Sequence, residues 1–161
     1  MARRLAILVL AALAAPSLCA AKSAGDFLSD AIKGDNSEIA LGKMAASKAT
    51  SVGVRVFGQT LARDHSKAKA EAAKLATDMR LKPPEDSTPD AQAEQSRLRT
   101  MAGPGFDREF VRYMIDDHRK DIVAFEQEAR KQDGAVSALA RRQLPTLRHH
   151  LDLALAIGKL P

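Results

Sequence analysis

The stretch Tyr113-Met114-Ile115-Asp116-Asp117-His118 decides the fold, because it sets charged groups and an imidazole inside an apolar helical pattern. At about 100° per residue, the apolar residues of segment 106–132 fall on one stripe: Val111, Met114, Ile115, Ile122, Phe125 and Ala129. His118 lies close to the centre of that stripe, and Asp133-Gly134 ends the pattern. The segment therefore predicts a long amphipathic helix that turns one histidine toward the core.

The same arrangement occurs earlier in the chain, in Gln59-Thr60-Leu61-Ala62-Arg63-Asp64-His65. From about residue 53 to Arg80 a second stripe follows helical spacing: Val54, Phe57, Leu61, Ala68, Ala72, Leu75 and Met79. His65 falls at its centre, while Asp64 lies toward its edge. Pro83-Pro84 ends the pattern, because proline lacks a donor and restricts the preceding residue. A second long helix with one inward histidine is predicted.

The first helical segment, from about Asp26 to Thr50, carries a carboxylate in the middle of its apolar stripe. The stripe consists of Phe27, Ala31, Gly34, Leu41 and Ala45. Glu38 lies among them, where a carboxylate is costly unless it is paired or bound to a cation. The alternative is that Asp35-Asn36 ends one short helix and that Glu38, partly solvated, begins another.

The last helical segment, about Ala135 to Ile157, has an inner face of four apolar residues: Leu139, Leu147, Ala154 and Ile157. His150 falls among them, and His149 points away. Pro145 lies inside this pattern, so we expect a kink or break near Arg142. Gly158 ends the segment.

A short helix is predicted between the second and third long helices. Thr88 suits its cap, Pro89 its first position and Gly103-Pro104 its stop. Its apolar content is low, as in a crossover. The chain is therefore predicted to be all-α, an antiparallel four-helix bundle with a short extra helix in the crossover between helices 2 and 3. Asp107, at the start of the third long helix, is expected to cap that helix.

The N-terminus has the pattern of a cleaved signal peptide over residues 1–21, which leaves residues 22–161 as the mature domain. A basic start is followed by an apolar run, Leu5 to Ala15, and by small residues around Cys19-Ala20-Ala21. A membrane anchor is the alternative, but the run is shorter than the roughly 20 residues of a span. Lipidation of Cys19 is a further alternative, which the lack of a small residue directly before it disfavours. The protein is thus expected to be periplasmic or secreted.

Charge and composition exclude some classes of partner. The formal net charge is +5, and lysine and arginine are mixed with acidic residues as on a solvated helix surface. Because no basic run carries interleaved aromatic residues, nucleic acid is not an expected partner. After signal cleavage no integral membrane span and no cysteine remain, so disulfides do not contribute.

Four inward polar residues are expected to meet at one depth of the bundle. Glu38, His65, His118 and His150 each lie near the middle of their helix, and the midpoints of antiparallel helices share a layer. One carboxylate and three imidazoles suit one divalent transition metal such as Zn, Cu or Fe. Further aspartates are candidates for holding an imidazole through its other nitrogen, or for replacing a ligand: Asp121, Asp117 and Asp64. The alternative is a metal-free, hydrogen-bonded network.

The chain also resembles the bacterial domain of unknown function 4142 family, which is ferritin-like and often labelled "predicted outer membrane protein". The matching stretches are Ser37-Glu38-Ile39-Ala40-Leu41-Gly42, Asp64-His65, Phe106-Asp107-Arg108, Tyr113 to His118, and Leu144-Pro145-Thr146-Leu147-Arg148-His149-His150-Leu151. The resemblance implies a secreted or periplasmic ferritin-like domain. The sequence itself departs from the di-metal pattern of the wider ferritin-like group, because Ala62 and Ile115 stand where carboxylates would be needed. One metal ion is expected instead.

Two functions follow. The first is a metal-binding envelope protein, acting in metal handling or stress defence. The second is a metal-free structural or interaction module whose buried histidines and glutamate specify the bundle. The sequence shows no nucleophile-base constellation, so no enzymatic activity is assigned, and catalysis would need a metal with an open position.

Overall fold

The computed structural model describes residues 22–131 and 134–159, and within these ranges it contains helices and no strand. The predicted signal peptide, residues 1–21, lies outside the described residues, as does Asp133. The helices are α1 (Ala24–Lys48), α2 (Val52–Asp78), α3 (Pro89–Thr100), α4 (Gly103–Arg130) and α5 (Gly134–Ile157). The all-α prediction is confirmed. Among the described helices, none is long and apolar enough to cross a membrane.

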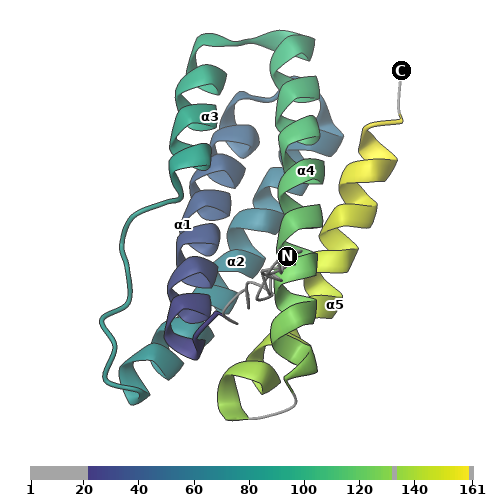
Figure 1. Ribbon diagram of the computed structural model, residues 1–161. Coiled ribbons are helices and arrows are strands. Elements are labelled where there is room, and N and C mark those ends of the chain that lie inside the picture. The colour runs from purple at the N-terminus through teal and green to yellow at the C-terminus, as the bar shows by residue number, and fades with distance from the viewer. Residues whose placement is uncertain (1–21, 132–133, 160–161) are drawn as a thin grey trace, which may run out of the picture.

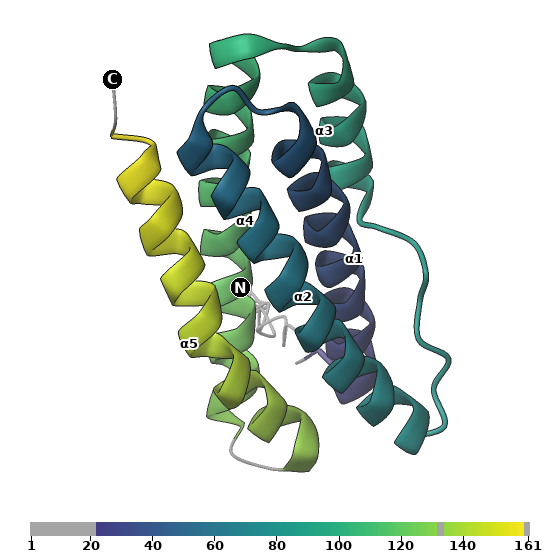
Figure 2. The same ribbon diagram turned by 180° about the vertical axis from the view of Figure 1, so that it is seen from behind.

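The long helices form two antiparallel hairpins (Figures 1 and 2). α1 packs along α2, α4 packs along α5, and α2 also contacts α5. After α2 the chain runs back along the outside to α3, which contacts α1 and α4. The short helix in the crossover is therefore present where the sequence predicts it. Each of the four long helices turns one face toward a common interior.

Local chemistry explains several helix boundaries. The Thr88 hydroxyl accepts from the Ala91 backbone N–H, so Thr88 caps α3 as predicted, with Pro89 directly after it. Gly103-Pro104, predicted to stop α3, instead begins α4, three residues before the predicted start. Gly103 has a φ of 61°, which favours glycine, and Pro104 lies in the first turn, where the helix needs no donor.

Two of the long helices, α1 and α5, are continuous where the sequence allowed an interruption. α1 runs through Asp35-Asn36 without a break, so Glu38 does not begin a second helix. α5 likewise runs through Pro145, so of the expected kink or break near Arg142 the break is wrong. Leu144 and Leu147, on either side of that proline, are buried, so tertiary packing holds the helix where propensity alone would end it.

Asp107 joins two hairpins and does not cap its own helix. Its carboxylate accepts from the backbone N–H groups of Thr50, at 3.0 Å, and Ser51, at 2.7 Å. Both donors lie in the α1–α2 turn, and Asp107 is itself buried. The prediction that Asp107 caps its own helix is therefore wrong. Its side chain instead accepts from backbone N–H groups of another segment that would otherwise have no partner.

Two apolar clusters form the core, one toward each end of the long helices. One contains Leu41, Phe57, Leu61, Phe106, Phe110 and Met114, and the other contains Phe27, Leu28, Ile32, Phe125, Leu139 and Leu147. On α1, Glu38 lies between the residues of the two clusters. Met79, predicted to face inward, is 42% exposed at the end of α2. The core is thus divided by a polar layer.

A close crossing of α1 and α2 positions this layer. A Cβ atom placed on Gly42 would lie 2.6 Å from the Gly58 carbonyl oxygen, and one on Gly58 would lie 2.6 Å from the Gly42 carbonyl oxygen. Real side chains do not tolerate such contacts, so only glycine lets these backbones meet. Glu38 is one helical turn from Gly42, and His65 is two turns from Gly58. The crossing therefore brings these two side chains together.

Candidate metal centre

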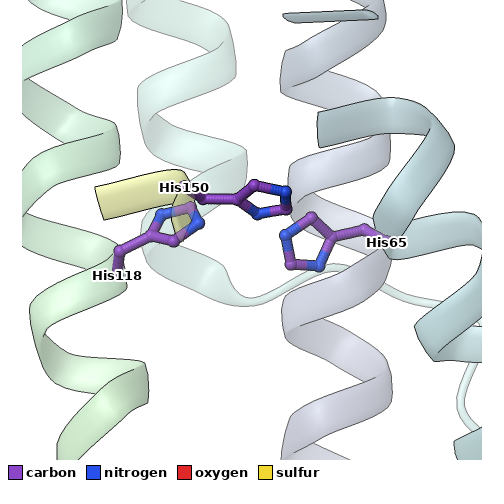
Figure 3. A group of neighbouring side chains, drawn as sticks. All are labelled: His65, His118 and His150. Atoms are coloured by element: carbon purple, nitrogen blue, oxygen red, sulfur yellow. The ribbon is translucent and has the colours of Figure 1, made fainter. Parts of the chain in front are cut away.

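Four side chains from four helices meet in the polar layer. Glu38 comes from α1, His65 from α2, His118 from α4 and His150 from α5. Their exposed fractions are 0%, 3%, 0% and 0%. Figure 3 shows the three imidazoles pointing toward one another, and one nitrogen of each lies within 4.8 Å of the others. The residues that the sequence places at matched depth are thus neighbours in space.

His65 lies between two carboxylates of α1. Its Nδ1 donates to Asp35 Oδ1 at 2.8 Å. Its Nε2 is 2.5 Å from Glu38 Oε2, an ion-pair distance outside hydrogen-bond geometry. Asp35 was missed as a partner by the sequence reasoning. Its position three residues before Glu38, on the same helical face, was the available signal.

The other two imidazoles are each held through one nitrogen. His118 Nδ1 is 2.9 Å from the Met114 carbonyl oxygen and 3.2 Å from Glu38 Oε1. His150 Nε2 is 3.2 Å from Asp64 Oδ2. Because a carbonyl or carboxylate oxygen can only accept, the nitrogen facing it carries the proton. The second nitrogen of each ring, Nε2 of His118 and Nδ1 of His150, therefore presents a free lone pair.

Five buried atoms of the layer have no hydrogen-bond partner. They are both carboxylate oxygens of Glu38, Nε2 of His65, Nε2 of His118 and Nδ1 of His150. A buried polar atom left without a partner costs about 1–3 kcal/mol. Once His65 has lost its proton, all five can donate an electron pair, so a cation bound among them would give each atom a partner. The donor set fits a transition metal that accepts nitrogen and oxygen ligands.

The charges of the layer are unevenly distributed. Burial by itself would raise the pKa of Glu38, but the attraction of His65 and His118 lowers it to about 2. Burial opposes protonation of His65, yet Glu38 and Asp35 raise its pKa to about 10. Burial lowers the pKa of His118 and, with the repulsion of His65, brings that of His150 to about 4. At neutral pH the metal-free layer thus holds one imidazolium and two neutral imidazoles.

Asp117 and Asp121 do not hold an imidazole, which was one of the two roles expected of them. Among the described residues neither donates to nor accepts from an imidazole; Asp35, Asp64 and a backbone carbonyl fill that role. Instead, oxygens of Asp117, Asp121 and Glu38 all lie within 4.8 Å of one another. Burial and the charge of Glu38 raise the pKa of Asp117 to about 7 and that of Asp121 well above its usual range.

A cavity of about 310 Å³ leads from the layer to the surface. Glu38, His65 and Asp121 are among the residues at its buried end. Exposed side chains of α2 and α5 line it farther out, including Glu71 and Arg142, which form an ion pair of 3.8 Å. A small ion or molecule therefore has a route to Glu38 and to the imidazole of His65.

The comparisons agree with the family resemblance. Residues 10–157 match the family described as "Domain of unknown function (DUF4142)". Curated proteins give no match. Among solved structures, the fold is similar to the crystal structure of "putative secreted protein DUF305 from Streptomyces coelicolor", with a TM-score of 0.70 and 15% identity over 84% of this chain and 91% of that chain. Because the family match covers most of the sequence, the chain belongs to the DUF4142 family of domains of unknown function.

Proposed function

We propose that this protein is a secreted or periplasmic metal-binding protein, a ferritin-like four-helix bundle that holds one transition-metal ion. The ligands are Glu38, His65, His118 and His150. Its role is metal handling or stress defence in the cell envelope, with residues 22–161 as the mature domain after removal of the signal peptide.

The observation that carries this proposal is the convergence of three buried imidazoles beside the buried Glu38 carboxylate, with free lone pairs on Nε2 of His118 and Nδ1 of His150. Each imidazole has its other nitrogen turned to an oxygen acceptor, namely Asp35, the Met114 carbonyl or Asp64. Metal-binding histidines almost always have such a partner, which fixes the tautomer and directs the free lone pair. A merely structural network gives no reason for Nε2 of His118 and Nδ1 of His150 to be buried without a partner.

The types of ligand atom restrict which metal can bind. Three imidazoles and one carboxylate suit Zn, Cu or Fe better than Mg or Ca, which prefer oxygen. The protein residues supply the ligand positions, neutralise the charge through Glu38 and orient the rings through Asp35 and Asp64. The cavity beside His65 gives the ion an entry route and leaves one side of the layer open to a small ligand.

The proposed location rests on three supports. The N-terminal sequence has the pattern of a signal peptide. The described helices include no membrane-spanning candidate. The similar Streptomyces coelicolor protein carries the word secreted in its name.

A second candidate function is a metal-free structural or interaction module of the envelope. One observation favours it, because His65 already lies between Asp35 and Glu38 at ion-pair distances. In that case the layer is a buried ionic network that specifies the helix arrangement and leaves His118 and His150 neutral. Removing a histidine would then change stability but no metal content.

Elemental analysis and calorimetric titration of untagged mature protein separate the two candidates. We expect about one equivalent of Zn, Cu or Fe, or of Zn after reconstitution, with a rise in the melting temperature by mass action. His150→Ala should abolish both. His149→Ala is the matched control, because His149 is adjacent but exposed, and should retain both. Less than about a tenth of an equivalent in the reconstituted protein would refute the metal.

A further inference from the structure

We propose that Glu38, Asp117 and Asp121 form a second cation site beside the histidine site, specific for a hard divalent cation such as Mn²⁺. The two sites share Glu38, so the polar layer holds two cations of different character. The inference rests on the proposed function only through that shared carboxylate.

The three carboxylates lie close together without a protein cation. One oxygen of each lies within 4.8 Å of the others. Within the described residues, no lysine or arginine nitrogen comes within 4 Å of Asp117 or Asp121, and neither side chain has a hydrogen bond. Lys120, next along α4, is directed to Asp90 at 4.0 Å. Ionised carboxylates gathered in this way repel one another, and either a proton or a cation between them relieves that repulsion.

Glu38 is the fully buried member of this group of carboxylates. Its side chain is fully buried, and neither of its oxygens has a hydrogen-bond partner. Burying an ionised carboxylate is costly unless a cation compensates it. The His65 imidazolium does so on one side. A carboxylate has two oxygens and about four lone-pair sites, so Glu38 can face the histidines and the aspartates at once.

Helix geometry explains why the two sites adjoin. Asp117 and Asp121 are four residues apart on α4 and so lie on one face, one turn from each other. His118 lies between them in sequence and points to the imidazoles. Asp121 lies beside α1, because a Cβ on Gly34 would be in ordinary contact with Asp121 Oδ2, at 3.8 Å. One turn of α4 therefore serves both sites.

The chemistry of the ligands distinguishes the two cations. The histidine site offers mostly nitrogen, which suits Zn or Cu, whereas the second site offers only carboxylate oxygens. Such oxygens, completed by water, select Mg²⁺, Mn²⁺ or Ca²⁺. Binding there would offset the repulsion among the three carboxylates. The cavity reaches Asp121 as well as His65, so both ions share one entry.

The test is a titration of the full mature protein with Mn²⁺, followed by electron paramagnetic resonance, with and without one equivalent of Zn already bound. We expect about one equivalent of bound Mn²⁺ in the Zn-loaded protein, with weak or absent coupling to nitrogen because the ligands are oxygen. Asp117→Asn and Asp121→Asn should each weaken Mn²⁺ binding at least about tenfold and leave the Zn stoichiometry unchanged. Asp116→Asn, an exposed neighbour on the same helix, is the matched control.

Each outcome decides one site separately. Less than about 0.2 equivalents of Mn²⁺ in Zn-loaded protein, or undiminished binding in both asparagine variants, overturns the second site. Strong imidazole nitrogen coupling to Mn²⁺ in the wild-type protein overturns it too, and this readout does not depend on any variant folding. Loss of Zn binding with retained Mn²⁺ binding would instead refute the histidine site and leave the carboxylate site standing.

Discussion

Replacing Gly58 with alanine should separate α1 from α2 at the point that sets the polar layer. The new Cβ would lie 2.6 Å from the Gly42 carbonyl oxygen and 2.9 Å from the Cβ of Ala45. Ordinary contact begins at 3.4 Å, so the backbones must move apart by several tenths of an ångström. Overpacking of this kind costs about 1–3 kcal/mol, and the better helix propensity of alanine returns up to about 1 kcal/mol. We expect a net loss of about 1–2 kcal/mol.

Urea denaturation of the metal-free mature protein measures this loss. With a slope of about 1–3 kcal/mol per molar urea, the midpoint should fall by roughly 1 M. Gly53→Ala is the matched control in the same helix, because its Cβ would meet only Ser51 Oγ, at an ordinary 3.6 Å. That variant should be neutral or slightly stabilised.

The separation should also weaken metal binding, because Glu38 and His65 lie on the two helices that move apart. We expect Zn affinity to fall about tenfold or more in Gly58→Ala, as when ligand-supporting groups are disturbed, and to stay unchanged in Gly53→Ala. The reasoning is refuted if Gly58→Ala is as stable as Gly53→Ala, since the backbones would then not meet as described.

Three further predictions concern the charges and hydrogen bonds around the layer. Zn affinity should rise about tenfold per pH unit between pH 6.5 and 8.5. The reason is that the metal needs neutral His65, whose pKa of about 10 keeps the ring protonated over this range. A pH-independent affinity, or no proton release in calorimetry, would contradict this. Asp35→Ala should weaken Zn binding about 10–100-fold, because it removes the acceptor of His65 Nδ1. Asp152→Ala, exposed on α5, should have no effect, and equal affinities of the two variants would show that Asp35 does not support the site. Asp107→Ala should lower the free energy of unfolding by about 1–3 kcal/mol, because two turn N–H groups lose their acceptor. Urea denaturation measures this loss, and Zn affinity should be retained. An unchanged midpoint would show that water replaces the carboxylate.

Periodicity predicted the elements of the fold and the depth of the four polar residues. Apolar residues at helical spacing indicated the four long helices, and the Thr88-Pro89 capping pattern indicated the short one. Proline and glycine marked the helix ends to within a few residues. Since midpoints of antiparallel helices share a layer, the meeting of Glu38 with three histidines followed from counting along each helix. These features depend on local sequence, which is why single-sequence reasoning reached them.

Tertiary contacts account for what the sequence did not predict. Gly42 and Gly58 read as weak helix formers, and only the crossing of α1 and α2 shows why they are glycine. Asp35 becomes a partner of His65 through that same crossing. Asp107 serves a turn 56 residues away, where local patterns predict only a cap of its own helix. Pro145 stays helical because its neighbours are packed in the core.

The most direct test of the central claim is an anomalous-diffraction map of crystals of the mature protein grown with Zn. We predict one strong peak in the polar layer, about 2.0–2.2 Å from Glu38 and from Nε2 of His65, Nε2 of His118 and Nδ1 of His150. A map without a peak at these atoms, with His65 Nε2 still paired to Glu38, would contradict the account.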